Sequence, residues 1–190
     1  IELCNKLKTD ERTSHIPIIL LTAGVGEDHE LLGLQSGADD FITKPFKLKI
    51  LQARVDNLIG NRKMLRTRYS HELILEAKDI ALTPTDEMFL NKLQSVLDDN
   101  LADPHFNAVA FCEKLAMSRM QLHRKLLAYT GLSTTAFIRS QRLKQAVHIL
   151  RTSDASISEI AYAVGFNTPS YFIKCFKETY KKTPTEYQDT

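Results

Sequence analysis

The feature that most constrains the fold is an internal repeat in the last third of the chain. Leu115 is matched by Val164, 49 residues later, and Leu122 is matched by Phe172, 50 residues later. The change from 49 to 50 implies one additional residue in the second copy. In each copy the apolar residues follow a helical period that a short turn interrupts. The sequence therefore predicts two helix-turn-helix units.

In each unit an apolar pair spaced four residues apart is expected to anchor the second helix to the first. The pairs are Leu122 with Leu126, and Phe172 with Phe176. The opposite face of each second helix is then left for a ligand or for solvent. The candidate DNA-binding residues are Ser118, Arg119, Met120, Gln121, His123 and Arg124 in the first unit, and Thr168, Ser170, Tyr171, Lys174 and Lys177 in the second.

These residue types suit DNA. Arg124 can donate two hydrogen bonds to a guanine edge, Gln121 can pair with adenine, and Met120 can touch a thymine methyl group. Ser118 and Thr168, near helix N-termini, are better placed for phosphates. The alternative is that both faces are solvated surfaces of an ordinary helical bundle.

Charge and spacing favour the DNA interpretation. Residues 105–190 hold 12 Lys and Arg against 6 Asp and Glu, whereas the whole chain has a net charge of only +2. A long helix predicted over 134–152 would join the two units and separate their second helices by roughly one DNA turn, ~34 Å. The basic part of the chain is thus also the repeated part, as a polyanionic partner requires.

Residues 85–190 resemble the DNA-binding domain of the AraC/XylS family of bacterial transcription regulators. The resemblance rests on three runs, ISEIAYAVGF at 157–166, SYFIKCFK at 170–177 and PTEY at 184–187. The first unit departs from the family pattern, because Ala116 occupies a position where glycine is common. The resemblance implies two recognition helices that enter neighbouring major-groove segments.

The first 60 residues alternate between helical and strand patterns, which favours an α/β arrangement. Apolar runs at 16–22 and 41–43 predict strands of a parallel sheet, the first of them buried. Helices are predicted at 1–9, 27–36 and 47–59, with Gly37 and Gly60 as the residues that stop the last two.

This segment resembles the second half of a response-regulator receiver domain, through PIILLTA at 17–23 and GADDFITKPF at 37–46. The resemblance implies that Thr22 contacts a phosphoryl group, that Lys44 pairs with it and that Phe41 is the aromatic switch residue. It also implies a cis bond between Lys44 and Pro45.

The acidic pair and the phosphoacceptor aspartate of such a domain lie on strands that this sequence does not contain. Asp39 and Asp40 are expected to lie in a solvated turn and not to replace them. We therefore expect no phosphoacceptor and no catalytic residue here, with Mg²⁺ bound only by an intact receiver. Residues 1–60 are expected to be partly disordered or paired with a second copy, because two strands leave sheet edges open.

Composition excludes several function classes. The three cysteines, Cys4, Cys112 and Cys175, are far apart and are expected to be reduced thiols, so neither a metal nor a cofactor is expected. No apolar run is long enough to cross a membrane. We expect a cytoplasmic location, although a parent protein could be membrane-anchored. An enzyme is not favoured, because no phosphate-binding loop or nucleophile–base pair is apparent.

The sequence thus predicts a mainly α protein with a truncated receiver at 1–60, a linker at 61–84 and a tandem helix-turn-helix domain at 85–190. The predicted function is sequence-specific transcription regulation, as the output part of a phosphorylation-controlled two-component protein of the hybrid type. Double-stranded DNA is the expected partner. A second copy, a sensor kinase in cis or in trans and RNA polymerase are further candidates. The alternatives are a protein-interaction module and a non-specific architectural DNA binder.

Overall fold

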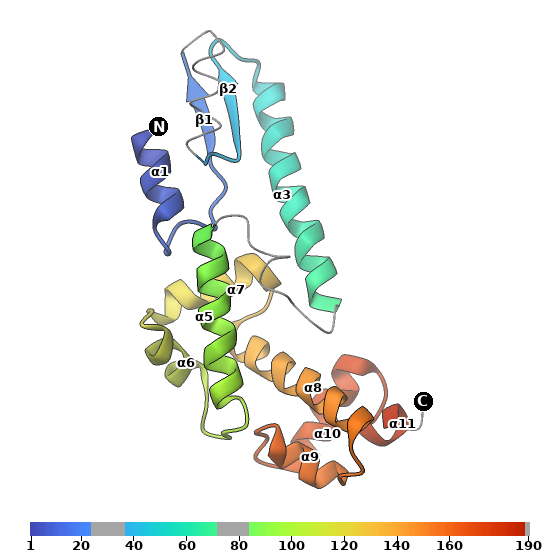
Figure 1. Ribbon diagram of the computed structural model, residues 1–190. Helices are drawn as coiled ribbons and strands as arrows, with labels where there is room; N and C mark the ends of the chain where they lie inside the picture. The colour runs from blue at the N-terminus through green and yellow to red at the C-terminus, as the bar shows by residue number, and fades with distance from the viewer. Residues whose placement is uncertain (24–36, 72–83, 189–190) are drawn as a thin grey trace. The chain divides into compact units, whose positions relative to one another are not determined.

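A computed structural model describes residues 1–23, 37–71 and 84–188. The chain forms two compact units (Figure 1). The first comprises Ile1–Asn91 with Ala128–Gly131, and the second comprises Lys92–Leu127 with Leu132–Thr190. The described part is mainly helical with one small sheet, which confirms the predicted fold class. The predicted domain bounds at 60 and 84 stay a prediction, and the helix predicted at 27–36 lies outside the described residues.

The first unit contains the α/β segment. Its elements in chain order are α1 (Glu2–Thr9), β1 (Ile19–Thr22), β2 (Asp40–Thr43) and α3 (Leu48–His71). The strands β1 and β2 pair in parallel, with Ile19 opposite Asp40 and Thr22 opposite Thr43. The predicted parallel pairing is therefore confirmed.

Two local predictions for this segment were wrong. The strand β1 is not fully buried, since Leu21 is 44% exposed. Within the described residues β2 is the only strand that pairs with β1, so less of the strand is covered. Helix α3 also runs through Gly60 to His71. A glycine inside a helix costs only about 1 kcal/mol relative to alanine, and Gly60 does not have a positive φ.

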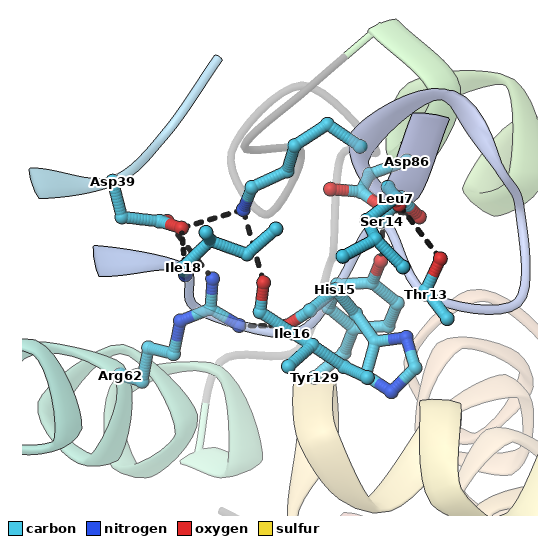
Figure 2. A network of polar contacts seen from close by, with 11 residues as sticks. Leu7, Thr13, Ser14, His15, Ile16, Ile18, Asp39, Arg62, Asp86 and Tyr129 are labelled. Carbon is cyan, nitrogen blue, oxygen red and sulfur yellow. Dashed lines mark hydrogen bonds and ion pairs between the residues drawn. The ribbon is translucent and has the colours of Figure 1, made fainter. Parts of the chain in front are cut away.

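Asp39 is the centre of a polar network (Figure 2) and does not lie in a solvated turn, contrary to our prediction. Its Oδ2 accepts hydrogen bonds from Lys8 Nζ at 2.5 Å and from the Ile18 amide at 2.7 Å. Its Oδ1 accepts one from Arg62 at 3.2 Å. Asp40 is likewise engaged, by Arg54 at 2.5 Å. The side-chain partners of Asp39 and Asp40 come from α1 and α3, so proximity in the chain did not reveal them.

The second unit is a bundle of short helices around one long helix, α8. Helix α5 (Pro84–Asn100) starts in the first unit and continues into this one. The helices that follow are α6 (Ala108–Leu115), α7 (Arg119–Thr130), α8 (Thr134–Thr152), α9 (Ile157–Ala163), α10 (Pro169–Tyr180) and α11 (Pro184–Gln188). The pair α6–α7 is the first helix-turn-helix unit, the pair α9–α10 is the second, and α8 joins them, as predicted.

Side-chain caps explain where several of these helices begin. Asn107 accepts hydrogen bonds from the amides of Val109 and Ala110 at the start of α6. Ser133 caps α8 through the amide of Ala136. Such caps satisfy amides that a helix leaves without partners in its first turn. Because capping is a local property, the predicted bounds 134–152 for α8 agree with the structure.

The predicted apolar anchors form the cores of the two units. Leu122 and Phe172 are fully buried, and so is Phe176, while Leu126 is 1% exposed. The core around the second helix-turn-helix unit also includes Phe166, Ala146 and Ile160. No helix among the described residues is both long and apolar enough to cross a membrane.

Candidate nucleic-acid interface

Helix α7 presents the first candidate recognition face. Burial of Leu122 and Leu126 fixes one side of the helix against the core. The opposite side carries Arg119, His123 and Arg124, all exposed, and Met120, which is 62% exposed. This exposed face therefore carries two guanidinium groups.

The N-terminus of α7 is closed by a reciprocal pair of hydrogen bonds. Ser118 Oγ accepts from the Gln121 amide at 3.2 Å, and Gln121 Oε1 accepts from the Ser118 amide at 2.9 Å. This arrangement is a capping box. The Gln121 oxygen is therefore occupied within the helix, and pairing both ends of its amide with adenine would require this bond to break.

Lys125 is a residue that sequence reasoning missed. It follows Arg124 in the chain, yet its side chain is fully buried. Its position three residues after Leu122 places it on the inner face of the helix, and this spacing was the available signal. Lys125 therefore does not belong to the exposed basic face of α7.

Helix α10 presents the second candidate face. Thr168 caps it by accepting a hydrogen bond from the Tyr171 amide, and Pro169 occupies its first position. Tyr171 is 51% exposed. Ser170, Lys174 and Lys177 are exposed as well, so every predicted residue of this unit lies at the surface.

The structure adds Arg139 of α8 to the candidate residues. A side-chain hydrogen bond with Tyr171 raises the pKa of Arg139. Both residues line a groove of about 320 Å³. Asn107 of the first helix-turn-helix unit and Asn167 of the second line the same groove. No local pattern separates Arg139 from other basic residues of α8, because its role depends on the packing of α10 against that helix.

Arg142, one turn further along α8, has a structural role. It donates hydrogen bonds to the carbonyl oxygens of Leu101 at 3.1 Å, Asp103 at 2.7 Å and Phe106 at 3.1 Å. Burial lowers its pKa. The residue therefore holds the loop between α5 and α6 against α8 and is not part of the exposed basic surface.

Comparisons with known proteins agree with this geometry. Residues 111–190 match the family model described as a helix-turn-helix domain. A crystal structure of an AraC-type transcriptional regulator from Chromobacterium violaceum superposes with a TM-score of 0.51 at 23% identity, covering 56% of this chain and 95% of that one. The chain carries an AraC-type helix-turn-helix domain.

Two curated relatives add to this comparison. The chain is 39% identical over 188 residues to a protein named histidine kinase P4 from Formosa agariphila, covering 99% of this chain and 14% of that protein. It is 36% identical over 97 residues to the HTH-type transcriptional activator RhaS of Escherichia coli, covering 51% of this chain and 34% of that protein. The chain thus spans well under half of each relative. The chain contains an AraC-family helix-turn-helix domain of the transcription-regulator type.

The residues predicted for a receiver switch lie at and near the carboxyl ends of the two strands. Thr22 ends β1 and pairs with Thr43, and the Lys44 amide donates to the Thr22 carbonyl oxygen at 2.7 Å. The bond between Lys44 and Pro45 is cis, as the resemblance implied. Phe41 is half-buried within β2. The backbone thus places Thr22 and Lys44 side by side, while their roles stay a prediction.

The cysteines do not alter this assignment. Cys4, Cys112 and Cys175 are all buried and none forms a disulfide. Burial raises the pKa of the Cys112 thiol, which disfavours the reactive thiolate form. In the part of the chain that the structure describes, no group of three or more His, Cys, Asp or Glu is arranged to hold a metal ion.

Proposed function

We propose that this chain binds a specific DNA sequence through α7 and α10 and regulates transcription. One observation carries the proposal. In both units a buried apolar pair fixes one side of the second helix, and basic and polar side chains cover the opposite, exposed side. Protein-binding surfaces are usually depleted in charge at their centre, so this composition favours a polyanionic partner. Each helix would enter one segment of the major groove.

Distinct roles are proposed for the exposed residues. Arg124 is the candidate base reader of α7, since a guanidinium group can donate two hydrogen bonds to guanine. Lys174 and Lys177 extend the basic face of α10 and suit phosphates. Arg139 would add a positive charge beside Tyr171, between the two helices. Ser118 and Thr168 would contact phosphates at the N-termini of α7 and α10.

We further propose that this domain is the output part of a two-component signalling protein. Support comes from the match of nearly the whole chain to a protein named as a histidine kinase. Thr22 and Lys44, adjacent at the sheet edge, would contact the phosphoryl group of a complete receiver. A sensor kinase in cis or in trans, a second copy of the chain and RNA polymerase are the proposed protein partners.

Selection of bound sites from a pool of random DNA duplexes tests the DNA-binding proposal. We expect enrichment of a motif with two blocks about one helical turn apart. The double variant Arg124→Ala with Lys174→Ala should lose this enrichment. Lys114→Ala, which removes an exposed positive charge from α6, serves as the matched control and should retain it.

The other outcomes identify the alternatives. Binding without enrichment, with a steep dependence on salt, would identify an architectural DNA binder. No binding even at low salt would contradict the proposal and favour a protein-interaction module.

A further inference from the structure

A buried carboxylate, Asp86, lies at the start of α5 with two hydroxyl groups directed at it (Figure 2). Its side chain is fully buried within the first unit. Asp86 Oδ1 accepts a hydrogen bond from Ser14 Oγ at 2.6 Å and another from the Tyr129 hydroxyl. Ser14 precedes β1, and Tyr129 lies in the last turn of α7. One oxygen atom therefore joins three segments that are far apart in the sequence.

The residues around Asp86 are buried. Ser14 is fully buried, and Tyr129 is 5% exposed. The Tyr129 ring contacts His15 and Phe89, with centroid separations of 6.2 Å in both cases. Burial strengthens a hydrogen bond electrostatically, because the local dielectric constant is low.

The segment that carries Ser14 is also held from its other side. Lys8 donates to the Ile16 carbonyl oxygen at 3.0 Å, and Arg62 donates to the His15 carbonyl oxygen. Both cations also contact Asp39, just before β2. The polar contacts of Figure 2 therefore run from the start of β2 through residues 14–16 to Asp86 and Tyr129.

Helix α7 is continuous from Arg119 to Thr130, so Tyr129 is part of the same rigid element as the candidate base reader Arg124. We infer that Asp86 is a positioning residue for DNA binding: it ties residues 13–16 to the last turn of α7, so that the packing of the receiver-like segment controls how firmly the first recognition helix is held. This inference rests on the proposed function. It names the part of the chain through which the receiver-like segment would act on that function.

Loss of either hydroxyl leaves Asp86 with one fewer donor while the aromatic and backbone packing remains. We expect Ser14→Ala and Tyr129→Phe each to lower DNA affinity about two- to tenfold, the change that corresponds to one hydrogen bond. Because both donors act through the same oxygen, the effect of the double variant should differ from the product of the single effects.

The experiment uses the full 190-residue chain and the duplex selected above. Fluorescence anisotropy gives the Kd, and hydrogen exchange followed by mass spectrometry gives the protection of each helix. Ser14→Ala should accelerate exchange in the last turn of α7 and leave α10 unchanged. Ser140→Ala removes a hydroxyl of α8 that bonds the Phe137 carbonyl oxygen at 2.8 Å, and it is the matched control for a general loss of stability.

The outcomes separate this inference from the proposed function. Accelerated exchange in α7, weaker binding and a non-additive double variant would support the role of Asp86. If the wild-type chain binds DNA but Ser14→Ala has the same effect as the control Ser140→Ala, the role of Asp86 alone is overturned. Strictly additive losses of affinity in the double variant would overturn it as well. Failure of the wild-type chain to bind any duplex would overturn the proposed function, and the inference with it.

Discussion

The two helix-turn-helix units share one plan but are built from different side chains. In the first, Leu122 and Leu126 anchor the second helix. In the second, Phe172 and Phe176 do so, with ring centroids 5.7 Å apart, and Phe176 also packs against Tyr187 at 5.5 Å. Aromatic contacts of this kind add to the stability that burial provides. Helix α10 is therefore held within its own helix-turn-helix unit. The last turn of α7 instead groups with the compact unit that contains Ile1–Asn91.

The turns of the two helix-turn-helix units also differ, in length and in how closely they are packed. Three residues separate α6 from α7, and five separate α9 from α10. Ala116 adopts a left-handed conformation at φ 56°, and Gly165 does so at φ 82°. A Cβ atom on Gly165 would lie 2.4 Å from the Leu101 carbonyl oxygen and 2.9 Å from Arg142 Nε. The second turn is therefore packed closely enough to require glycine, while the first accepts alanine.

The largest expected effect comes from the buried anchors. Phe172→Ala should lower the free energy of unfolding by about 3–5 kcal/mol, and the equivalent Leu122→Ala by about 2–5 kcal/mol, because each leaves a cavity in a packed core. Urea denaturation followed by circular dichroism measures both. The contrast between the units would be refuted if Leu122→Ala cost more than Phe172→Ala.

Exchanging the turn residues should have effects of opposite sign. Gly165→Ala should cost about 2–4 kcal/mol of unfolding free energy, from backbone strain and from the clash with Leu101. Ala116→Gly should instead stabilise by about 0.5–1 kcal/mol, since glycine adopts a positive φ without strain. Thermal unfolding of both variants checks this, and a loss of stability in Ala116→Gly would contradict it.

The two recognition faces should also respond differently. Arg124→Ala should weaken binding to the selected duplex by about 1–3 kcal/mol and relax the preference at one base pair. Lys174→Ala should weaken binding to selected and random duplexes alike and reduce the slope of log affinity against log salt by about 1. Titrations at several salt concentrations distinguish these cases. Equal weakening of all duplexes by Arg124→Ala would reassign Arg124 to phosphate.

The smallest effect concerns the capping boxes. Glu159 accepts from the Ser156 amide at 2.8 Å, and hydrogen bonds with Ser156 lower its pKa. Its stabilising contribution is therefore complete above the ordinary glutamate pKa of 4.5 and is lost as the pH falls below that value. The box formed by Ser118 and Gln121 has no titratable group and should show no such dependence.

Paired variants measure this difference. Glu159→Gln should reduce the loss of stability between pH 7 and pH 3, and Gln121→Ala should lower stability to a similar extent at both pH values. Denaturation at the two pH values is the readout. An unchanged pH dependence in Glu159→Gln would show that the box does not contribute.

Local signals predicted most helices of the two helix-turn-helix units, because caps and helical periods act over a few residues. Asn107, Ser156 and Pro169 lie at the starts of α6, α9 and α10, where their residue types favour the beginning of a helix. Local signals failed where a distant partner decides the environment. The stop predicted at Gly60 was wrong, and the contact of Arg139 with Tyr171 could not be inferred from the neighbours of Arg139 in the chain. The burial of Lys125 was missed although its spacing from Leu122 indicated the inner face of α7.

The sequence by itself determined the two repeated units, the helix that joins them and the basic faces they expose, because each follows from side-chain periodicity and charge. Only the tertiary structure decided which polar groups are withdrawn from solvent. Asp39 meets Lys8 and Arg62, and Asp86 meets Ser14 and Tyr129, across 23 to 72 positions of sequence. A buried carboxylate is stable only where such donors converge, and folding alone brings them together.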